Sequence, residues 1–327
     1  MPIVVTGGAG FIGSAIVAEL NKRGREDIII VDDVTHDEQE HNIGHLQYDQ
    51  MFGIAEFREK LLAGEFDSEG IEAIIHMGAC SSTTETDWVY LEDNNVEYSK
   101  DIIRWCQSNN ARCIYASSAA TYGNGENGYS DDVKLFDELV PLNLYGKSKL
   151  LVDIWARDGR FLDQAVGLRF FNVYGPNEWH KEEMMSLVAK KYPDIAEGKS
   201  MTLFKSYEKK YGDGEQMRDF IYVKDAVRAV LYFLDNPKIG GVFNVGTGKA
   251  TTWLAIARAM FSASTMPEKI EFIEMPEHIR HQYQYFTQAD TKKLADTGFD
   301  ISANYDVKSA ITEYIQDYLA PHRHLGE

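Results

Sequence analysis

Short runs of apolar, mostly β-branched residues alternate with longer amphipathic stretches along the first half of the chain. The short runs predict strands over residues 3–5, 28–31, 73–76, 113–116 and 166–170. Between them, apolar residues recur at three- and four-residue spacing, which predicts helices over 11–22, 54–63, 88–107 and 144–157. Strands and helices that alternate in this way favour an α/β fold with a doubly wound parallel sheet.

The pattern becomes irregular after Pro176 and later returns to the earlier style. A very polar stretch over 205–215 predicts an exposed loop or lid. Further strands are expected over 219–223, 241–245 and 270–273, with helices over 225–234 and 307–319. We therefore expect two domains, each built from two segments: a Rossmann domain over 1–171 and 218–247, and a smaller α/β domain over 172–217 and 248–327.

Charge and composition exclude several classes of protein. The 327 residues include 33 Lys and Arg against 51 Asp and Glu, a formal net charge of −18, whereas nucleic-acid and anionic membrane surfaces need a basic footprint. No apolar run reaches the length of a membrane span, and glycines interrupt the first run too early for a signal peptide. Three scattered cysteines, Cys80, Cys106 and Cys113, fit neither a disulfide scaffold nor a metal knuckle, so we expect a cytoplasmic protein.

A glycine-rich motif, Thr6 to Gly13, follows the first predicted strand and opens the first predicted helix. Its spacing, G-x-x-G-x-x-G, gives a tight turn, a backbone that can approach a diphosphate, and a helix N-terminus for the phosphates. We interpret it as a dinucleotide-binding turn, and the alternative is a merely structural glycine turn. The residues expected to contact the cofactor here are Gly7, Gly10, Phe11, Ile12 and Gly13.

Two acidic residues, Asp32 and Asp33, stand at the end of the second predicted strand. A carboxylate at this position accepts hydrogen bonds from the adenosine ribose, and we assign that role to Asp32. No Lys or Arg lies between Arg25 and Arg58, and further acids crowd the region where a 2′-phosphate would lie. The sequence therefore predicts NAD in preference to NADP. The alternative is that these acids only form a solvated loop.

Tyr145 and Lys149 stand four residues apart and so share one face of a predicted helix. An ammonium beside a phenol lowers the pKa of the tyrosine towards that of a working general base. Ser118 ends a predicted strand at the sheet edge where doubly wound folds bind ligands. Tyr-x-x-x-Lys alone is usually a surface pair, but the three elements together predict a catalytic Ser/Tyr/Lys set.

With the glycine motif, these residues resemble the extended short-chain dehydrogenases/reductases of the nucleotide-sugar epimerase and dehydratase group. Three later blocks, residues 168–176, 218–225 and 243–248, resemble the same group, so the likeness runs over nearly the full length. Within the group, residues 79–85, 116–122 and 283–290 and the pair His180-Lys181 look most like the ADP-L-glycero-D-manno-heptose 6-epimerases.

This resemblance implies an isomerase that epimerises a nucleotide-sugar through a transient keto intermediate. Tyr145 would take the proton of the sugar hydroxyl as hydride passes to NAD⁺, and Ser118 would hold the reacting oxygen. Lys181 matches the family's second acid/base, and the alternative is a solvent-exposed lysine in a polar loop. The implied substrate is ADP-heptose, a precursor of the lipopolysaccharide core, and the implied assembly is a homo-oligomer.

The resemblance also implies binding residues. Residues 76–79, with Gly78 and Ala79 among them, and Asn95 would lie along the cofactor, together with Tyr145 and Lys149. The residues implied to meet the nucleotide-sugar are Asn172, Lys181, Ser186, Arg218 and Tyr283, with Arg218 as the cation for the diphosphate.

The chain departs from the family pattern at several places. The lysines that suit NADP are absent after the second predicted strand. Glu182 and Glu183 stand where the family tends to have glycine and small residues, so two carboxylates are expected to enter a substrate-facing wall. Gln282 replaces a usual arginine, for which Arg280 could substitute from two residues away, and the 205–215 loop is longer than usual.

Other readings of the sequence stay open. A nucleotide-sugar 4-epimerase needs only the tyrosine and a freely rotating keto-sugar, and Lys181 is the feature that discriminates. A 4,6-dehydratase is disfavoured because Ala119 and Ala120 stand where an acid pair is expected. A non-catalytic NAD-binding regulatory or structural protein is the alternative outside enzymes.

The remaining candidate residues do not indicate a site. The pairs His278/His281 and His322/His324 lack a third ligand at suitable spacing, so no metal site is expected. Cys80 is read as packing rather than a nucleophile.

Overall fold

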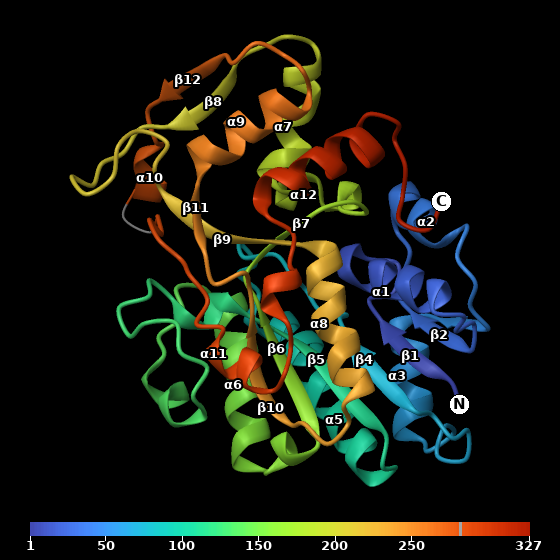
Figure 1. The fold of residues 1–327 in the computed structure, drawn as a ribbon. Coiled ribbons are helices and arrows are strands. Elements are labelled where there is room, and N and C mark those ends of the chain that lie inside the picture. The colour runs from blue at the N-terminus through green and yellow to red at the C-terminus, as the bar shows by residue number, and fades with distance from the viewer. Residues whose placement is uncertain (281–282) are drawn as a thin grey trace.

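A seven-stranded parallel sheet forms the larger part of the structure, as predicted (Figure 1). The computed structural model describes residues 1–280 and 283–327, so Gln282 and His281, and the side chain of His278, lie outside what it describes. The strand order is β10-β6-β5-β4-β1-β2-β3. The strands are β1 (Ile3–Thr6), β2 (Ile28–Val31), β3 (Gln50–Phe52), β4 (Ala73–His76), β5 (Arg112–Ser118), β6 (Ala165–Phe170) and β10 (Gly241–Val245).

Both faces of this sheet are buried, which explains why its strands are continuous apolar runs. Successive residues point to opposite faces: Ile3 and Val5 belong to one core cluster and Val4 to another. The first cluster includes residues of α1 (Phe11–Lys22) and α8 (Val223–Asp235). The second includes residues of α3 (Ile54–Leu62), α5 (Tyr98–Ser108) and α6 (Leu144–Asp158). The sheet is therefore doubly wound, with helices on both faces.

The strand order reverses between β1 and β4. From β1 the chain adds β2 and β3 in one direction, and it then returns to place β4, β5, β6 and β10 on the other side of β1. Ligands of doubly wound sheets bind at the carboxyl ends of the strands beside this reversal. The glycine-rich turn after β1 and residues 77–80 after β4 both lie there.

A second group of elements lies beyond the carboxyl ends of the large sheet (Figure 1). A small sheet joins β11 (Ala250–Thr252), β9 (Met217–Tyr222) and β7 (Asn172–Tyr174), while β8 (Met201–Phe204) pairs in parallel with β12 (Ile270–Ile273). A separate core cluster joins β7, β8 and β9 with α7 (Leu187–Ala196), α9 (Trp253–Ala263) and α12 (Val307–Glu313). Residues 205–216, between β8 and β9, contain neither helix nor strand, as expected for an exposed loop.

Several elements differ from the sequence-based expectation. The stretch expected as one helix over 88–107 contains α4 (Trp88–Leu91) and a π-helical segment, Glu92–Glu97, before α5. The last helix likewise ends in a π-helical segment, Tyr314–Leu319, after α12. Short helices not expected from the sequence are α2 (Asp37–Ile43), α10 (Glu277–Arg280) and α11 (Lys292–Asp296). In the described part of the chain, no helix combines the length and apolarity needed to cross a membrane.

Candidate active site

Two adjoining cavities lie at the carboxyl ends of β1, β4 and β5. One has a volume of about 370 Å³ and the other about 310 Å³. They share a wall, so we treat them as one continuous groove; the shared residues are Phe11, Ile12, Met77, Ala79, Cys80, Ser81, Ala116 and Lys181. The smaller cavity is lined by the glycine-rich turn, and the larger one by the predicted catalytic residues.

The glycine-rich turn leaves no room for side chains beneath the smaller cavity. Gly7 has φ of 66°, and a Cβ there would lie 2.7 Å from the backbone nitrogen of Gly78. A Cβ on Gly13 would meet the carbonyl oxygen of Gly7. Helix α1 begins directly after Gly10, and no side chain caps its first turn. Its N-terminal end lines the cavity, which is the arrangement that binds a diphosphate.

A chain of hydrogen bonds joins this turn to β4 and α5. The N–H of Gly78 donates to Thr6 Oγ1 at 3.1 Å, and Thr6 Oγ1 lies 2.7 Å from Nδ1 of His76. Nε2 of His76 is 3.0 Å from Ser99 Oγ, which itself donates to the carbonyl oxygen of Asn95. Every bond is satisfied when Nε2 carries the proton of a neutral ring. Burial lowers the pKa of His76 to about 3, which keeps the ring neutral. His76 therefore braces the turn rather than exchanging protons.

Asp32 and Asp33 have different surroundings. Asp32 lines the smaller cavity, and its carboxylate accepts the N–H groups of Ala9 and Asp33, each at 2.9 Å. Burial raises the pKa of Asp32, and these backbone hydrogen bonds oppose the rise. Asp33 is exposed, is not part of the cavity wall, and accepts the N–H of Ile54 at 3.0 Å. Only Asp32 is placed to meet a cofactor.

Asn95 does not face either cavity. Its side chain is fully buried, accepts the N–H of Cys80 at 2.9 Å and donates to the carbonyl oxygen of Cys80 at 3.0 Å. It also donates to Ser148 Oγ on α6 at 3.1 Å. Asn95 thus holds the segment after β4 against α6, whereas Gly78 and Ala79 line the smaller cavity.

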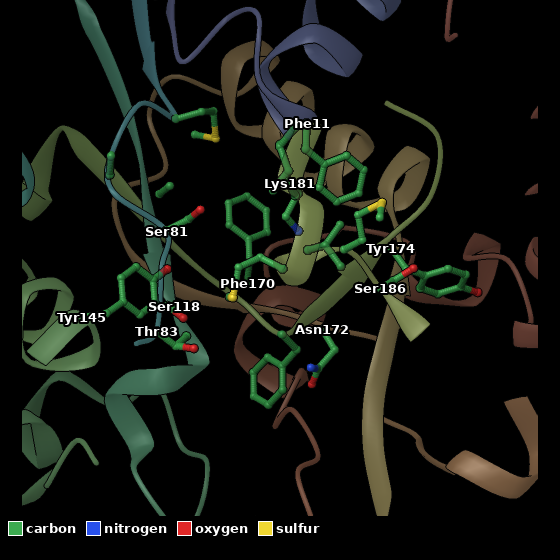
Figure 2. A pocket seen from close by; sticks show the side chains of 18 of the residues that line it. Phe11, Ser81, Thr83, Ser118, Tyr145, Phe170, Asn172, Tyr174, Lys181 and Ser186 are labelled. Carbon is green, nitrogen blue, oxygen red and sulfur yellow. The ribbon is translucent and has the colours of Figure 1, made fainter. Parts of the chain in front are cut away.

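Tyr145, Lys149 and Ser118 all line the larger cavity. Helix α6 begins at Leu144, where Asn143 Oδ1 accepts the N–H of Gly146 at 2.7 Å and so fixes the first turn. Figure 2 shows Tyr145 beside Ser118 on one side of the cavity. The Lys149 amine lies 6.0 Å from the centroid of the Tyr145 ring.

Burial is the largest influence on the pKa values of Tyr145 and Lys149. It raises the pKa of Tyr145, and hydrogen bonding with Ser118 opposes the rise. The expectation that Lys149 lowers the pKa of Tyr145 is therefore not met in the protein alone. Burial lowers the pKa of Lys149 to about 8, partly offset by the Asp153 carboxylate one turn along α6. Asp153 is held by a fully buried ion pair with Arg169, at 2.9 Å.

Lys181 enters the larger cavity from the side opposite Tyr145 and Ser118 (Figure 2). It belongs to the kinked 3₁₀ helix Trp179–Met184, and its amine lies 4.8 Å from the centroid of the Phe11 ring. Lys181 is half-buried and lines the cavity, unlike the solvent-exposed lysine of the alternative, and burial lowers its pKa. The two acid/base candidates therefore face one cavity from opposite sides.

Glu182 and Glu183 do not enter the cavity wall, contrary to expectation. Their side chains are 72% and 100% exposed, and they lie near His36 and Lys190 respectively. The chain turns outward at Glu182, whose φ is 46°, a backbone conformation that favours glycine. The wall beside Lys181 is made instead by Met184, Met185, Ser186 and Leu187.

The residues expected to meet the nucleotide-sugar fall into two places. Asn172 and Ser186 line the larger cavity. Arg218 and Tyr283 lie together outside this wall, with the guanidinium 5.3 Å from the centroid of the Tyr283 ring. Burial lowers the pKa of Arg218. Arg280 instead stacks on Tyr207, 4.0 Å from the ring centroid.

Sequence reasoning missed several residues of the cavity wall. Ser81 and Thr83 add hydroxyls beside Tyr145 and Ser118 (Figure 2), and the sequence block 79–85 offered a signal for them. Phe220 and Trp253 also line the larger cavity. They come from β9 and α9, and no local spacing could have assigned them to the cavity.

Comparisons with known proteins agree with this geometry. Residues 3–246 match the NAD dependent epimerase/dehydratase family. A protein of Nitratidesulfovibrio vulgaris strain DP4 named ADP-L-glycero-D-manno-heptose-6-epimerase is 48% identical over 318 residues, which cover 97% of this chain and 98% of the relative. A Fusobacterium nucleatum protein with the same name is 44% identical, covering 97% and 98%. The crystal structure of the Helicobacter pylori ADP-L-glycero-D-manno-heptose-6-epimerase superposes with a TM-score of 0.79 at 26% identity, covering 97% and 95%.

Proposed function

The chain belongs to the NAD dependent epimerase/dehydratase family, and on that basis we propose that it is an ADP-L-glycero-D-manno-heptose 6-epimerase. The relatives that carry this name support the substrate. The observation that carries the reaction is the approach of Tyr145 and Lys181 to one cavity from opposite sides. An epimerase must handle the proton of one hydroxyl in two orientations, and two acid/base groups on opposite sides can do so. The product would serve lipopolysaccharide core synthesis.

The groove has two features that suit the binding of NAD. The uncapped N-terminus of α1 can bind the diphosphate, and Asp32 can accept the adenosine ribose hydroxyls. When bound, NAD supplies the hydride acceptor and donor for the oxidation and reduction of the sugar carbon. We propose that NAD is preferred over NADP, because a 2′-phosphate beside Asp32 would meet like charge.

Tyr145 is proposed as the base that removes the proton of the sugar hydroxyl. Ser118 lies beside Tyr145 in the cavity wall (Figure 2) and would hold the reacting oxygen there. Lys149 provides a buried amine on the same side and is proposed to bind a ribose hydroxyl of the cofactor. The family resemblance suggests these roles, and the shared position of the three residues in the wall of the larger cavity supports them.

Lys181 is proposed as the acid/base for the opposite orientation of the keto-sugar. After the ketone presents its other face, its oxygen points away from Tyr145 and towards Lys181. Burial lowers the pKa of Lys181, which makes the exchange of a proton by this group easier. Asn172 and Ser186 line the same cavity and are proposed to contact the sugar. Arg218 and Tyr283 are proposed to contact the nucleotide part.

We also propose the division into an NAD-binding domain, 1–171 and 218–247, and a substrate domain, 172–217 and 248–327. The membership of β10 in the large sheet and the separate core around α7, α9 and α12 support it. A cytoplasmic homo-oligomer is proposed from the cysteine usage and the family resemblance. Gel filtration with light scattering would test the assembly.

The function is tested by incubating the protein with ADP-D-glycero-D-manno-heptose and NAD⁺, and separately NADP⁺, and following the C6 configuration by proton NMR in D₂O. We expect conversion to the L-glycero epimer without deuterium at C6, because the hydride returns to the same carbon. Lys181→Ala should abolish conversion, while Lys191→Ala, which changes a half-buried lysine of α7 outside the cavity wall, should leave it intact. Failure of the wild-type protein to convert this substrate would reject the assignment, and activity on UDP-hexoses would favour a 4-epimerase.

A further inference from the structure

A cluster of three potential metal ligands lies at the C-terminal tail, away from the groove. His322 and His324 lack a third ligand at suitable spacing in the sequence, but the fold brings Glu38 of α2 close to them. One ligand atom from each residue lies within 4.8 Å of the others. Nε2 of His322 is 3.8 Å from Glu38 Oε1, and Nε2 of His324 is 3.6 Å from Glu38 Oε2. The chain end runs beside α2 in Figure 1.

The ring of His324 is held in one orientation by Asn42. The amide nitrogen of Asn42 donates to the carbonyl oxygens of Ala9, at 3.0 Å, and Asn177, at 3.2 Å. Its amide oxygen lies 2.8 Å from Nδ1 of His324, so Nδ1 must be the donor of that bond. Nε2 is thereby directed at Glu38. Histidine ligands of metal ions are oriented by such a hydrogen bond on the other ring nitrogen.

The spacing inside the cluster does not correspond to direct hydrogen bonds. An N–H···O bond is about 2.7–3.2 Å long, and both His–Glu separations exceed it. Glu38 Oε2 is buried and has no hydrogen-bond partner among the residues that the structure describes. Ligand atoms at about 2.1 Å from a tetrahedral Zn²⁺ lie about 3.4 Å apart. The separations of 3.8 and 3.6 Å run to different oxygens of the Glu38 carboxylate and are somewhat longer than that edge, and a cation between the three side chains would satisfy the unpartnered oxygen.

We propose that Glu38, His322 and His324 bind a divalent transition-metal ion, with Zn²⁺ as the best match. Two imidazoles and one carboxylate are a donor set that Zn²⁺ takes in proteins, with water in the fourth position. His322 is 62% exposed and so gives the ion access from solvent, whereas His324 is 4% exposed and anchors the site in the fold.

The position of the cluster indicates a structural role for the ion. The Trp179 ring lies 4.5 Å from the His322 ring and 4.6 Å from the His324 ring, measured between centroids. Trp179 begins the 3₁₀ helix that carries Lys181. An ion bound by Glu38, His322 and His324 would hold the C-terminal tail against α2. Because both histidine rings pack against Trp179, it would also fix the position of the 3₁₀ helix that Trp179 begins. It would stabilise the wall of the larger cavity without entering it.

The experiment titrates Zn²⁺ into the full chain, without an affinity tag and after treatment with EDTA, and follows binding by calorimetry and by competition with a chromogenic chelator. We expect one equivalent of Zn²⁺ and a rise of the melting temperature on binding. Glu38→Gln and His322→Ala should each weaken binding at least tenfold and remove the rise. Glu40→Gln makes the same change at an exposed position of α2 and should bind as the wild type does.

Two results would overturn the proposal. One is the absence of stoichiometric binding by the wild-type protein. The other is equal binding by the wild type, Glu38→Gln and His322→Ala, which would mean that Zn²⁺ binds scattered histidines elsewhere. Circular dichroism of each variant shows whether it is folded. Because both substituted side chains are partly exposed, both variants should fold, and weaker binding then reports on the site itself.

Discussion

The carboxylate of Glu178 accepts both the N–H and the hydroxyl of Ser186, each at 2.6 Å. These bonds join the two ends of the segment that carries Lys181. Glu178 is fully buried and also accepts the hydroxyl of Tyr314 at 3.1 Å, so the segment is anchored to the C-terminal helix. Ser186 in turn accepts the N–H of Ala189 and so starts α7. Glu178 is therefore a positioning residue for Lys181.

Glu178→Gln should lower kcat by at least roughly tenfold, because displacement of an acid/base by about 1 Å has effects of this size. The glutamine has an amide group in place of one accepting oxygen, so at least one donor loses its partner. Unfolding free energy should fall by about 1–3 kcal/mol. NAD⁺ affinity, measured by fluorescence titration, should not change. A variant with wild-type kcat would contradict the positioning role, and Glu197→Gln at the exposed end of α7 is the control.

Lys149 should make stability depend on pH. Its folded pKa of about 8 lies below the ordinary 10.5, so between these values the unfolded chain holds more protons and stability rises with pH. At pH 7 the buried charge of Lys149 lowers the free energy of unfolding by up to roughly 3 kcal/mol. Lys149→Met should restore part of this free energy and abolish activity. Urea unfolding should show the stability difference between the two proteins shrinking from pH 7 to pH 10. A constant difference would argue against a depressed pKa.

The same titration should appear in the kinetics. If the protonated Lys149 is the active form, kcat/KM should fall as the pH rises through about 8. Equilibrium binding of NAD⁺ measured over the same range separates loss of cofactor from loss of chemistry. A profile that stays flat to pH 9.5 would assign the proton to another group.

Glu182→Gly should stabilise the protein by roughly 1 kcal/mol, because φ of 46° strains any residue with a Cβ. The exposed carboxylate contributes little, since its ion pair among the described residues is with His36 at 3.6 Å, on the surface. Glu183→Gly is the matched control: it removes a fully exposed carboxylate without relieving a positive φ, so it should not stabilise. Thermal melts of the two variants side by side test this. Equal effects would show that the strain is not significant.

The strongly patterned elements could be predicted from the sequence. The bounds of β2, β4, β10 and α1 agree with the expected ranges, because mostly apolar runs and a glycine turn leave few alternatives. Helix α2 could not be found this way, since its sequence, DEQEHNI, is almost wholly polar. It is held by the Gln39 side chain, which accepts the N–H of His36 at 3.2 Å, and by burial of Asn42 and Ile43.

The residues of the candidate site likewise fall into those that local sequence patterns predict and those that only the fold brings together. Residues that stand at the ends of predicted strands or at the start of a predicted helix, such as Ser118 and Tyr145, lie where the sequence predicted. Asn95 was assigned to the cofactor site by resemblance alone. Its side chain points to the protein interior, where it hydrogen-bonds with Cys80 and Ser148. The Glu38/His322/His324 cluster joins opposite ends of the chain, and only tertiary contacts create it. Local patterns predict positions on the sheet, whereas long-range contacts decide which side chains meet.

The choice of cofactor depends on Asp32, and this gives the last prediction. The wild-type protein should bind NAD⁺ at least tenfold more tightly than NADP⁺, because the Asp32 carboxylate lines the smaller cavity and no lysine or arginine occurs in residues 26–57 to offset it. Asp32→Asn removes the charge and should reduce the ratio of NAD⁺ affinity to NADP⁺ affinity several-fold. It should weaken NAD⁺ binding and also relieve repulsion of the 2′-phosphate of NADP⁺. Asp33→Asn changes an exposed carboxylate outside the cavity wall and should leave the ratio unchanged. Calorimetric titration of both cofactors into the three proteins measures the ratio. An Asp33 effect as large as that of Asp32 would mean that the general acidity of the loop, rather than one carboxylate, selects the cofactor.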